Sequence, residues 1–327
     1  MTPTTLEERA PGDAIAEDLS VPAPIPGVRP LEPRMVRLQR RLVLAATIIP
    51  FAGFVAAVWT LWGTGLTTVD ASLFLFFYLF TGLGITVGFH RYLTHGGFET
   101  VPWLRAAFAI AGSMAIQGSV IAWVSDHRRH HAFSDRPGDP HSPHLDEGPG
   151  VKGVVKGLWH AHVGWLFKDE LTSAERWAPD LWKDPTMRKI DKYFPVWVVL
   201  SFALPPAAGF ALTGTARGAV TAFLWASLAR IFLLHHVTWS INSICHFYGN
   251  RPYKTSDFST NNWLLAIISF GESWHNNHHA FPTSAVHGIG RGQVDLSGGI
   301  IRALQRMRLV RNVKVVSPKQ LAAKRLS

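Results

Sequence analysis

Histidines at fixed spacings are the residues of this chain best suited to chemistry. The 327-residue sequence holds 16 of them. Nine, with one asparagine, fall into four clusters: His90 and His95; His127, His130 and His131; Asn242 and His246; and His275, His278 and His279. A structural zinc takes four ligands, so nine imidazoles suit two metal ions with four or five ligands each. Imidazole binds iron, zinc, copper and nickel, so ligand type alone does not choose the metal.

The spacing within the clusters predicts helices. Residues three and four apart share one face of an α-helix, so the three histidines of each HxxHH cluster point together, as do Asn242 and His246. His90 and His95 are five residues apart, and an ideal α-helix places them on different faces. We therefore expect the helix to end or distort between these two histidines.

Four apolar runs would position the clusters. Each is about 20 residues long, enough to span a bilayer core as a helix, and they cover residues 42–62, 71–89, 194–212 and 219–237. Four arginines precede the first run and the link to the second has no Lys or Arg, so the positive-inside rule places the N-terminus in the cytoplasm. All four clusters then fall at cytoplasmic span ends or in the adjoining stretches 90–193 and 238–327. A weaker run, 106–124, would separate the clusters if it spanned, so we expect it to dip into the interface or pack under the cytoplasmic domain.

These observations predict an all-α membrane protein. Its four transmembrane helices would form two hairpins, capped by a helical cytoplasmic domain that holds a histidine-rich dimetal site. Residues 1–33, rich in Pro, Ala and acidic residues, predict a disordered tail, and residues 34–327 a single domain. The basic stretch 302–325, with interspersed Leu, Val and Met, predicts a cytoplasmic tail suited to a membrane surface.

Composition narrows the class of function. Hydrophobic residues make up 47% and charged residues only 17%, with a formal net charge of +10. In so apolar a chain, a basic balance favours contact with anionic lipid and predicts no nucleic-acid partner. Cys245 is the only cysteine, which excludes a disulfide framework and an iron–sulfur cluster held by this chain alone.

The other histidines predict plainer roles. His141 and His287 are expected in loops, and His162 in a structural or interfacial position. His235 lies inside the fourth apolar run, on the helical face of His246. It is either a partner behind the metal ligands or a residue packed in the bundle interior.

In combination, the motifs resemble those of membrane fatty acid desaturases, in particular the acyl-CoA Δ9 (stearoyl-CoA-type) family. The similarity extends from the first span to the C-terminal tail. It rests on these stretches: His90-Arg-Tyr-Leu-Thr-His95, Asp126-His127-Arg-Arg-His130-His131, Asp139-Pro140-His141, His162-Val-Gly-Trp165, Thr238-Trp239-Ser-Ile-Asn242-Ser-Ile-Cys-His246, Tyr248-Gly-Asn-Arg251-Pro252-Tyr253 and Gly271-Glu272-Ser-Trp-His275-Asn-Asn-His278-His279-Ala-Phe-Pro282.

The resemblance implies two iron sites beside a bent acyl tunnel. One iron would be bound by His90, His95, His127, His131 and His278. The other would be bound by His130, His246, His275 and His279, with Asn242 holding a water. The tunnel would be lined by Trp123, Trp165, Thr238 and Trp239, with Asp126 as a further residue on the substrate side. A recombinant preparation could carry zinc in place of iron.

The carrier of the acyl chain stays open at this point. The resemblance implies acyl-CoA, whose head group meets basic residues just after the His-Val-Gly-Trp motif in that family. Here Lys168, Asp169 and Glu170 follow closely, and two acidic residues match a CoA phosphate poorly. Acyl carrier protein or a membrane lipid therefore remains an alternative carrier.

The expected chemistry needs partners that supply electrons. Removing hydrogen from an unactivated methylene takes an oxidant made from O₂ and two electrons, which redox-inactive zinc does not provide. The sequence has no Gly-x-Gly-x-x-Gly motif, no cluster cysteines and no His-Pro-Gly-Gly haem motif of a fused cytochrome b5. We therefore expect a separate ferredoxin or cytochrome, with its reductase, as electron donor.

Three other functions fit parts of the pattern. A related hydroxylase, ketolase or alkane monooxygenase would share the histidine chemistry and differ in its product. A membrane metal transporter would place ligands within the spans and often show repeat symmetry, whereas most ligands here lie beyond the span ends. A scaffold without activity would keep the metal for structure, although every ligand position of the family is filled here.

Overall fold

Four long helices form the body of the molecule. The structure, a computed structural model, describes residues 24–63, 65–145, 148 and 150–326. Within them, four helices are long and apolar enough to cross a membrane: Pro33–Gly63, Thr68–Thr94, Phe194–Thr213 and Ala216–His246. Each contains one of the predicted apolar runs. The expected fold class, a helical membrane protein with four candidate spans and a histidine-rich cluster, is confirmed.

Two of the four helices are composite. The first and third are the single helices α1 (Pro33–Gly63) and α9 (Phe194–Thr213). The second continues from α2 (Thr68–Leu83) into the π-helix η1 (Gly84–Thr94). The fourth is built from α10 (Ala216–Ala222), the π-helix η3 (Phe223–Ala229), α11 (Arg230–Ser243) and the 3₁₀ turn η4 (Ile244–His246).

The distortion expected between His90 and His95 is the π-helix η1. There the N–H of His95 donates to the carbonyl of His90, five residues back, at 3.2 Å. The Thr94 hydroxyl donates to the carbonyl of Phe89, also five residues back, at 2.8 Å. Because π-helical hydrogen bonds join residues five apart, His90 and His95 face the same side. Gly84 lets η1 press on the next helix, since a Cβ there would lie 2.2 Å from the backbone nitrogen of Gly112.

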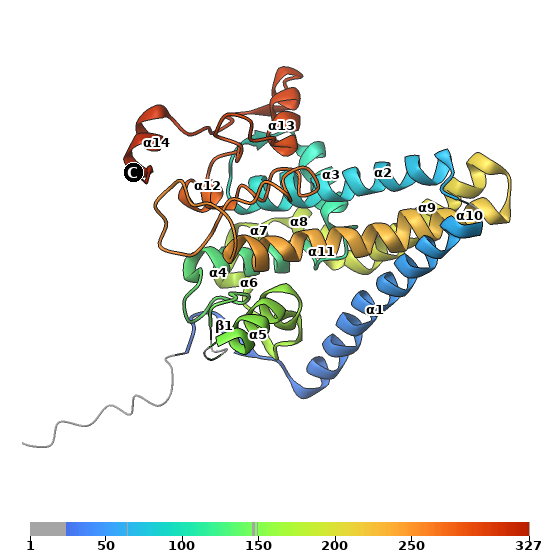
Figure 1. Ribbon diagram of the computed structural model, residues 1–327, viewed down its shortest axis with the longest axis horizontal. Helices are drawn as coiled ribbons and strands as arrows, with labels where there is room; N and C mark the ends of the chain where they lie inside the picture. Colours follow the sequence, from blue (N-terminus) through green and yellow to red (C-terminus); the bar gives the residue numbers. More distant parts are fainter. Residues whose placement is uncertain (1–23, 64, 146–147, 149, 327) are drawn as a thin grey trace, which may run out of the picture.

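The long helices share one direction, with one exception. Helices α2, α9 and α11 run side by side along the long axis of the molecule (Figure 1). Helix α1 packs on η3 near one end and slants away from the other helices toward the opposite end (Figure 1). The two short links between consecutive long helices lie together at the right-hand end of this view.

The opposite end carries a cap of short elements. It contains α3 (Pro102–Ser113), α4 (Val120–Phe133), α5 (Gly150–His162), the 3₁₀ turn η2 (Gly164–Phe167), α6 (Ala174–Trp177), α7 (Pro179–Lys183), α8 (Pro185–Lys192), α12 (His275–Ala280), α13 (Leu296–Arg306) and α14 (Pro318–Lys324). Two small antiparallel sheets join them: β1 (Val28–Pro30) with β3 (Glu170–Thr172), and β2 (Glu99–Thr100) with β4 (Val310–Arg311).

The structure orders parts of both chain ends. Most of the predicted tail, residues 1–23, lies outside the described residues, but Val28–Pro30 is ordered as β1 because β3 supplies backbone partners. The C-terminal stretch folds onto the cap: the Lys314 amide donates to the Gly97 carbonyl at 2.8 Å, and the Leu326 amide donates to the Pro252 carbonyl at 2.9 Å. This stretch packs against protein.

The weaker apolar run, 106–124, belongs to two helices. Helix α3 ends at Ser113 and α4 begins at Val120, and Ile116 between them has φ = 60°, which a continuing helix does not allow. Neither helix is among the candidate spans. The run therefore does not separate the histidine clusters.

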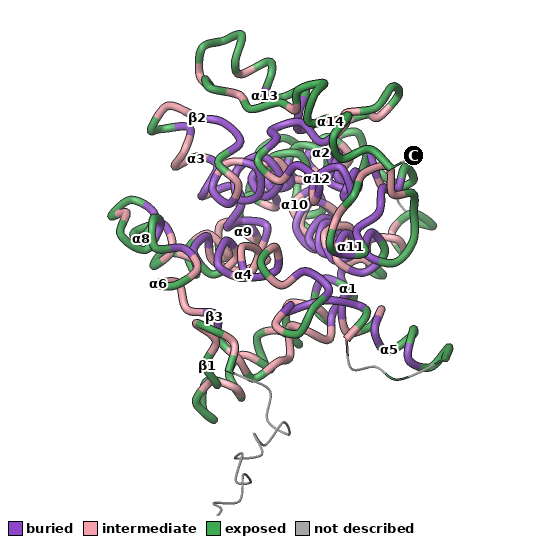
Figure 2. The backbone as a smooth tube through the Cα atoms, turned by 90° about the vertical axis from the view of Figure 1, so that its left-hand side faces the viewer, coloured by how far each residue is buried: buried purple, intermediate pink, exposed green. Residues whose placement is uncertain are grey.

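A shared apolar core holds the histidine-bearing elements in place. It joins Phe89 of η1, Val124 of α4, Met187 of α8 and Leu234 of α11. Viewed from the cap end, buried residues gather inside the group of helices (Figure 2). Helix α1 buries only three residues, and its apolar outer face suits contact with lipid.

Candidate metal centre

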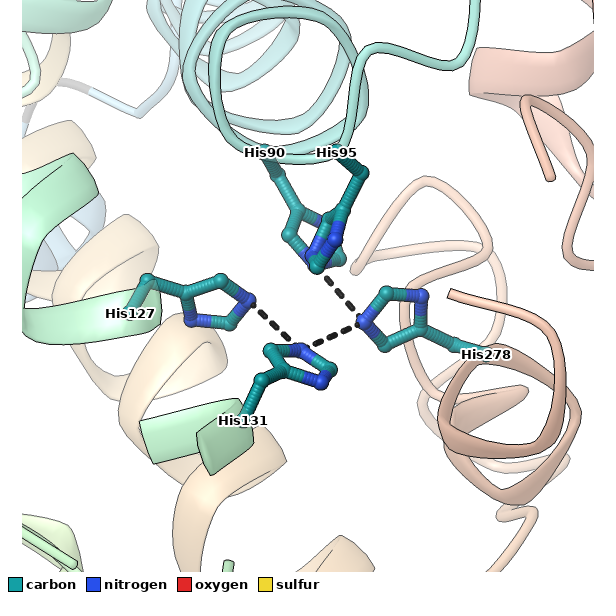
Figure 3. A group of neighbouring side chains, drawn as sticks. All are labelled: His90, His95, His127, His131 and His278. Atoms are coloured by element: carbon teal, nitrogen blue, oxygen red, sulfur yellow. Dashed lines mark hydrogen bonds between the residues drawn. The ribbon is translucent and has the colours of Figure 1, made fainter. Parts of the chain in front are cut away.

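Four elements bring the histidine clusters to one place. The ring nitrogens form two groups, and within each group the candidate ligand atoms all lie within 4.8 Å of one another. The first group, from η1, its C-cap, α4 and α12, comprises His90, His95, His127, His131 and His278. The second, from α4, η4 and α12, comprises His130, His246, His275 and His279. Figure 3 shows the first group converging on one point.

The spacing between the rings matches ligands of a metal ion. Neighbouring Nε2 atoms within the groups lie 2.9 to 3.1 Å apart, including His278 with His131 and His246 with His275 (Figure 3 marks three of these approaches). Imidazoles bonded to a metal at about 2.1 Å would place adjacent nitrogens roughly 3.0 Å apart at right angles, and roughly 3.4 Å apart at tetrahedral angles. The observed spacing is close to the first of these values.

Four carboxylates fix the orientation of four of these rings. Each lies close to an Nδ1 atom: Glu272 with His90 at 2.6 Å, Asp139 with His130 at 3.0 Å, Asp135 with His246 at 2.8 Å, and Asp257 with His279 at 2.8 Å. A carboxylate accepts the Nδ1–H, so the Nε2 lone pair is left to point into the group. A metal ion in the group would accept these lone pairs.

Other ring nitrogens also lack a protein partner. Among the described residues, Nε2 of His95 and of His130 is buried without a hydrogen-bond partner. A buried polar atom left unpaired costs about 1–3 kcal/mol. A metal ion in each group would pair with these atoms, and the residues present therefore fit two bound metal ions.

The electrostatics favour neutral rings at most members of the groups, but at His130 burial is outweighed by Asp139 and the pKa is raised. Burial, followed by repulsion from neighbouring histidines, holds the pKa of His127, His131 and His278 well below its usual range. Burial opposes ionisation of Glu272, but Arg91 and His90 outweigh it, so the pKa of Glu272 lies well below its usual value. Neutral imidazoles backed by ionised carboxylates are the forms that bind metal ions.

An apolar cavity of about 620 Å³ runs past the two groups. All five residues predicted for the substrate side line it: Trp123, Asp126, Trp165, Thr238 and Trp239. Asn242 and the ligand-type histidines His90, His127 and His275 also line it. Apolar cavities of a few hundred Å³ with a few polar groups are typical of small-molecule sites. This one brings an apolar guest alongside both groups.

Charges gather where α4 and β3 line the cavity. Arg129 pairs with Glu170 at 2.8 Å, and Arg40 pairs with Asp169 at 2.7 Å. Burial raises the pKa of Asp126 to about 6. The two acidic residues after the His-Val-Gly-Trp motif are thus neutralised by arginines within the protein.

Comparisons with known proteins agree with this site. The family model described as "Fatty acid desaturase" matches residues 70–293. A hex-5-enoyl-[acyl-carrier protein] acetylenase of Moorena producens is 40% identical over 89% of this chain and 91% of its own. The sn-1 stearoyl-lipid 9-desaturase of Anabaena variabilis is 38% identical over 75% and 84%, and delta-9 acyl-lipid desaturase 1 of Arabidopsis thaliana is 40% identical over 75% of each chain. The chain belongs to the fatty acid desaturase family. Its activity is therefore that of an oxidoreductase acting on acyl chains.

Sequence reasoning left out a second layer of residues in this desaturase. His287 and His141, expected simply in loops, do lie in loops but are buried beside the ligands. The Nδ1 of His287 lies 3.3 Å from Glu272, and the rings of His141 and His130 are 4.3 Å apart. The buried Arg91 bonds both Glu272 and Asp295 at 2.9 Å. Asp135 and Asp257 are far from their histidines in sequence, and no spacing rule would have paired them.

Two histidines of the desaturase lie away from the metal groups. The Nε2 of His235 lies 2.9 Å from the carbonyl of Ala115, so this ring packs within the bundle and also lines the cavity. His162 lies 3.0 Å from the Ser243 hydroxyl and 2.9 Å from a ring nitrogen of His236, and it connects α5 to α11.

Proposed function

We propose that this desaturase introduces a cis double bond, at the Δ9 position, into a saturated fatty acyl chain, using O₂ and two iron ions. The proposal rests on one observation, that the apolar cavity borders both histidine groups. The apolar cavity has His90 and His127 of the first group and His275 of the second in its wall. An acyl chain in the cavity would present its methylenes to both ions at once.

The metal assignment rests on ligand type and on the reaction. Iron would be held by the two histidine groups, with Asn242 holding a water at the second. Bound iron supplies the redox chemistry that side-chain acids and bases lack. Overall, the acyl chain loses two hydrogens, O₂ and two electrons with two protons are consumed, and two waters form.

The protein residues supply binding, orientation and exclusion of water. Trp123 stacks on His127 with ring centres 4.9 Å apart, so it would press an acyl chain toward the first group. Thr238 accepts a hydrogen bond from Gln117 at 2.9 Å, which ties the cavity wall together across two elements. A fixed wall positions one carbon–carbon bond near the metals. No side chain needs to act as a general base.

We further propose that the acyl chain arrives as acyl-CoA. The names of related proteins mention CoA, acyl carrier protein and lipid as carriers of the acyl chain. The objection from Asp169 and Glu170 is weakened because arginines pair with both, while Lys168 also lines the cavity. Supplying one acyl chain on each of the three carriers to the purified protein would test the choice, and turnover restricted to another carrier would refute it.

We also propose that both termini and the histidine cap are cytoplasmic. The arginine-rich start of α1 lies at the cap end, as the positive-inside rule requires. The electrons would come from a separate ferredoxin or cytochrome.

Analysis of products tests the proposed reaction. The protein would be expressed in membranes with a ferredoxin and its reductase, and the fatty acids analysed by gas chromatography–mass spectrometry. We expect a new monounsaturated chain that is lost in His127→Ala and in His278→Ala and kept in Lys189→Ala, an exposed position on α8. A hydroxylated product, or no product from an iron-loaded and reducible protein, would refute the proposal. Substrates should include an already unsaturated chain, because one relative is named as an acetylenase.

A further inference from the structure

A second cavity reaches the metal groups from another direction. It has a volume of about 590 Å³ and is lined by His95 and His131 of the first group and by His279 of the second. None of these three histidines lines the apolar cavity. All three are partly exposed, whereas His130, His246 and most other members of the groups are buried. The side chain of His279 is only 2% exposed, so the cavity ends close above the second group and reaches both groups from a side that the apolar cavity does not line.

The rim of this cavity is basic. Lys254 and Lys324 line it, both are exposed, and neither forms an ion pair with a carboxylate in the part of the chain that the structure describes. The Nζ of Lys324 donates to the carbonyl of Ala280 at 2.6 Å, which holds this ammonium beside α12. The one lining acid, Asp257, is buried and engaged with His279 and Ser259. The rim thus presents uncompensated positive charge.

Hydrogen bonds tie the rim to the ligand helix. The Lys254 amide donates to the Lys324 carbonyl at 2.7 Å. The side chain of Asn276 accepts from the Tyr253 amide at 2.9 Å and donates to the Tyr253 carbonyl at 3.0 Å. Asn276 lies in α12, between His275 and His278. The two lysines are therefore held at a fixed place relative to the histidines, which is what a docking surface needs.

We propose that this second cavity and its rim form the docking surface for an acidic electron-carrier protein, and that electrons enter by way of His95, His131 and His279, which line the cavity. The inference rests on the proposed function, which consumes two electrons per turnover. A carrier must come close to the metal centre, and this cavity is lined by histidines of both groups. Opposite charge would guide the carrier to the lysines and speed association.

The test uses full-length, iron-loaded protein in lipid nanodiscs and a small acidic [2Fe–2S] ferredoxin as the probe. Binding is measured by biolayer interferometry at several salt concentrations for wild type, Lys254→Glu and the control Lys189→Glu. Lys189 is exposed on α8, which lies away from α14 in Figures 1 and 2. We expect Lys254→Glu to raise the Kd about tenfold and to flatten its salt dependence. Lys189→Glu should stay within about twofold of wild type.

A second measurement distinguishes a loss of docking from a structural defect and from a loss of catalytic activity. Lys254→Glu should keep its iron content and its single turnover after chemical reduction with dithionite, while ferredoxin-driven turnover falls about tenfold. Unchanged ferredoxin affinity in Lys254→Glu would overturn the docking surface and leave the proposed function standing. A loss of the dithionite-driven turnover would also overturn it, because Lys254 would then be structural. A wild type that binds and accepts electrons yet forms no product would instead refute the desaturase proposal.

Discussion

Glu272 holds His90 through a contact of 2.6 Å between its Oε2 and the ring Nδ1, while its other oxygen bonds Arg91, the next residue along η1. One carboxylate thus fixes a ligand ring and neutralises a buried guanidinium. In the second group, Asp257 likewise fixes the ring of His279. The two carboxylates allow the two groups to be perturbed separately.

Glu272→Gln should weaken metal binding at the first group, and Asp257→Asn at the second. Removing a carboxylate behind a ligating histidine typically lowers metal affinity about 10- to 100-fold. Each variant should therefore retain close to one tightly bound iron per chain, measured by mass spectrometry of metals after dialysis against a chelator. The control, Glu99→Gln, changes an exposed acid that pairs with Arg311 and should bind iron as wild type does. Full retention in both variants would show that the carboxylates do not position the ligands.

Removing metal should destabilise the fold, because buried ring nitrogens such as Nε2 of His95 and of His130 would lack a partner. Re-adding iron or zinc at about 100 times its Kd contributes about 2.7 kcal/mol per site, or a rise in Tm of about 4 °C for a chain of this length. Both ions should restore Tm, whereas only iron should restore product. Thermal melts and product analysis on the same samples check this, and activity with zinc alone would contradict a redox role.

Filling the apolar cavity should shift the chain length accepted. Val198 lines the cavity, whereas the neighbouring Val199 is 64% exposed. Val198→Trp should lower turnover of the longer of two acyl chains relative to the shorter by about tenfold, since a methylene in a pocket is worth about 1–3 kcal/mol. Val199→Trp should leave the ratio unchanged. Mixed-substrate assays analysed by chain length make the comparison, and equal ratios in both variants would place the acyl chain elsewhere.

The His162 contact should make stability depend on pH. Burial, and then His236, lower the pKa of His162 to about 4, whereas an unfolded histidine titrates near 6.5. Between these values the unfolded chain binds a proton that the native ring does not, so stability falls as pH drops from about 6.5 toward 4. His162→Gln removes this contribution. From pH 7 to pH 5 wild type should lose about 2–4 °C more in Tm than the variant. Parallel melting curves would count against the shift.

The sequence was most informative where residues able to bind metal recur at a helical spacing and where apolar runs are long. The HxxHH spacing placed three histidines of α4 on one face, and hydropathy located all four candidate spans. The resemblance gave the division of nine histidines into sets of five and four, and the structure gathers the same sets. That these sets bind iron is still a proposal.

The parts that sequence reasoning could not reach depend on tertiary contacts. Asp135 approaches His246 from more than a hundred residues away, and only the folded cap brings them together. β1 forms because β3 offers a free edge, which composition does not reveal. The C-terminal stretch is basic enough for a membrane surface, but its backbone partners Gly97 and Pro252 lie in the cap.

In the π-helix η1, the number of residues between His90 and His95 matters more than the types of residue. Residues five apart align in a π-helix, so a codon inserted between His90 and His95 would turn the two rings apart. Losing one residue there would leave them four apart, a spacing that a regular α-helix also aligns. Conservative substitutions at outward positions would leave the pair in place. Over evolutionary time this stretch should therefore accept exchanges of residues at outward positions while rejecting insertions between His90 and His95, and a relative with an extra residue there would have lost the alignment of this pair.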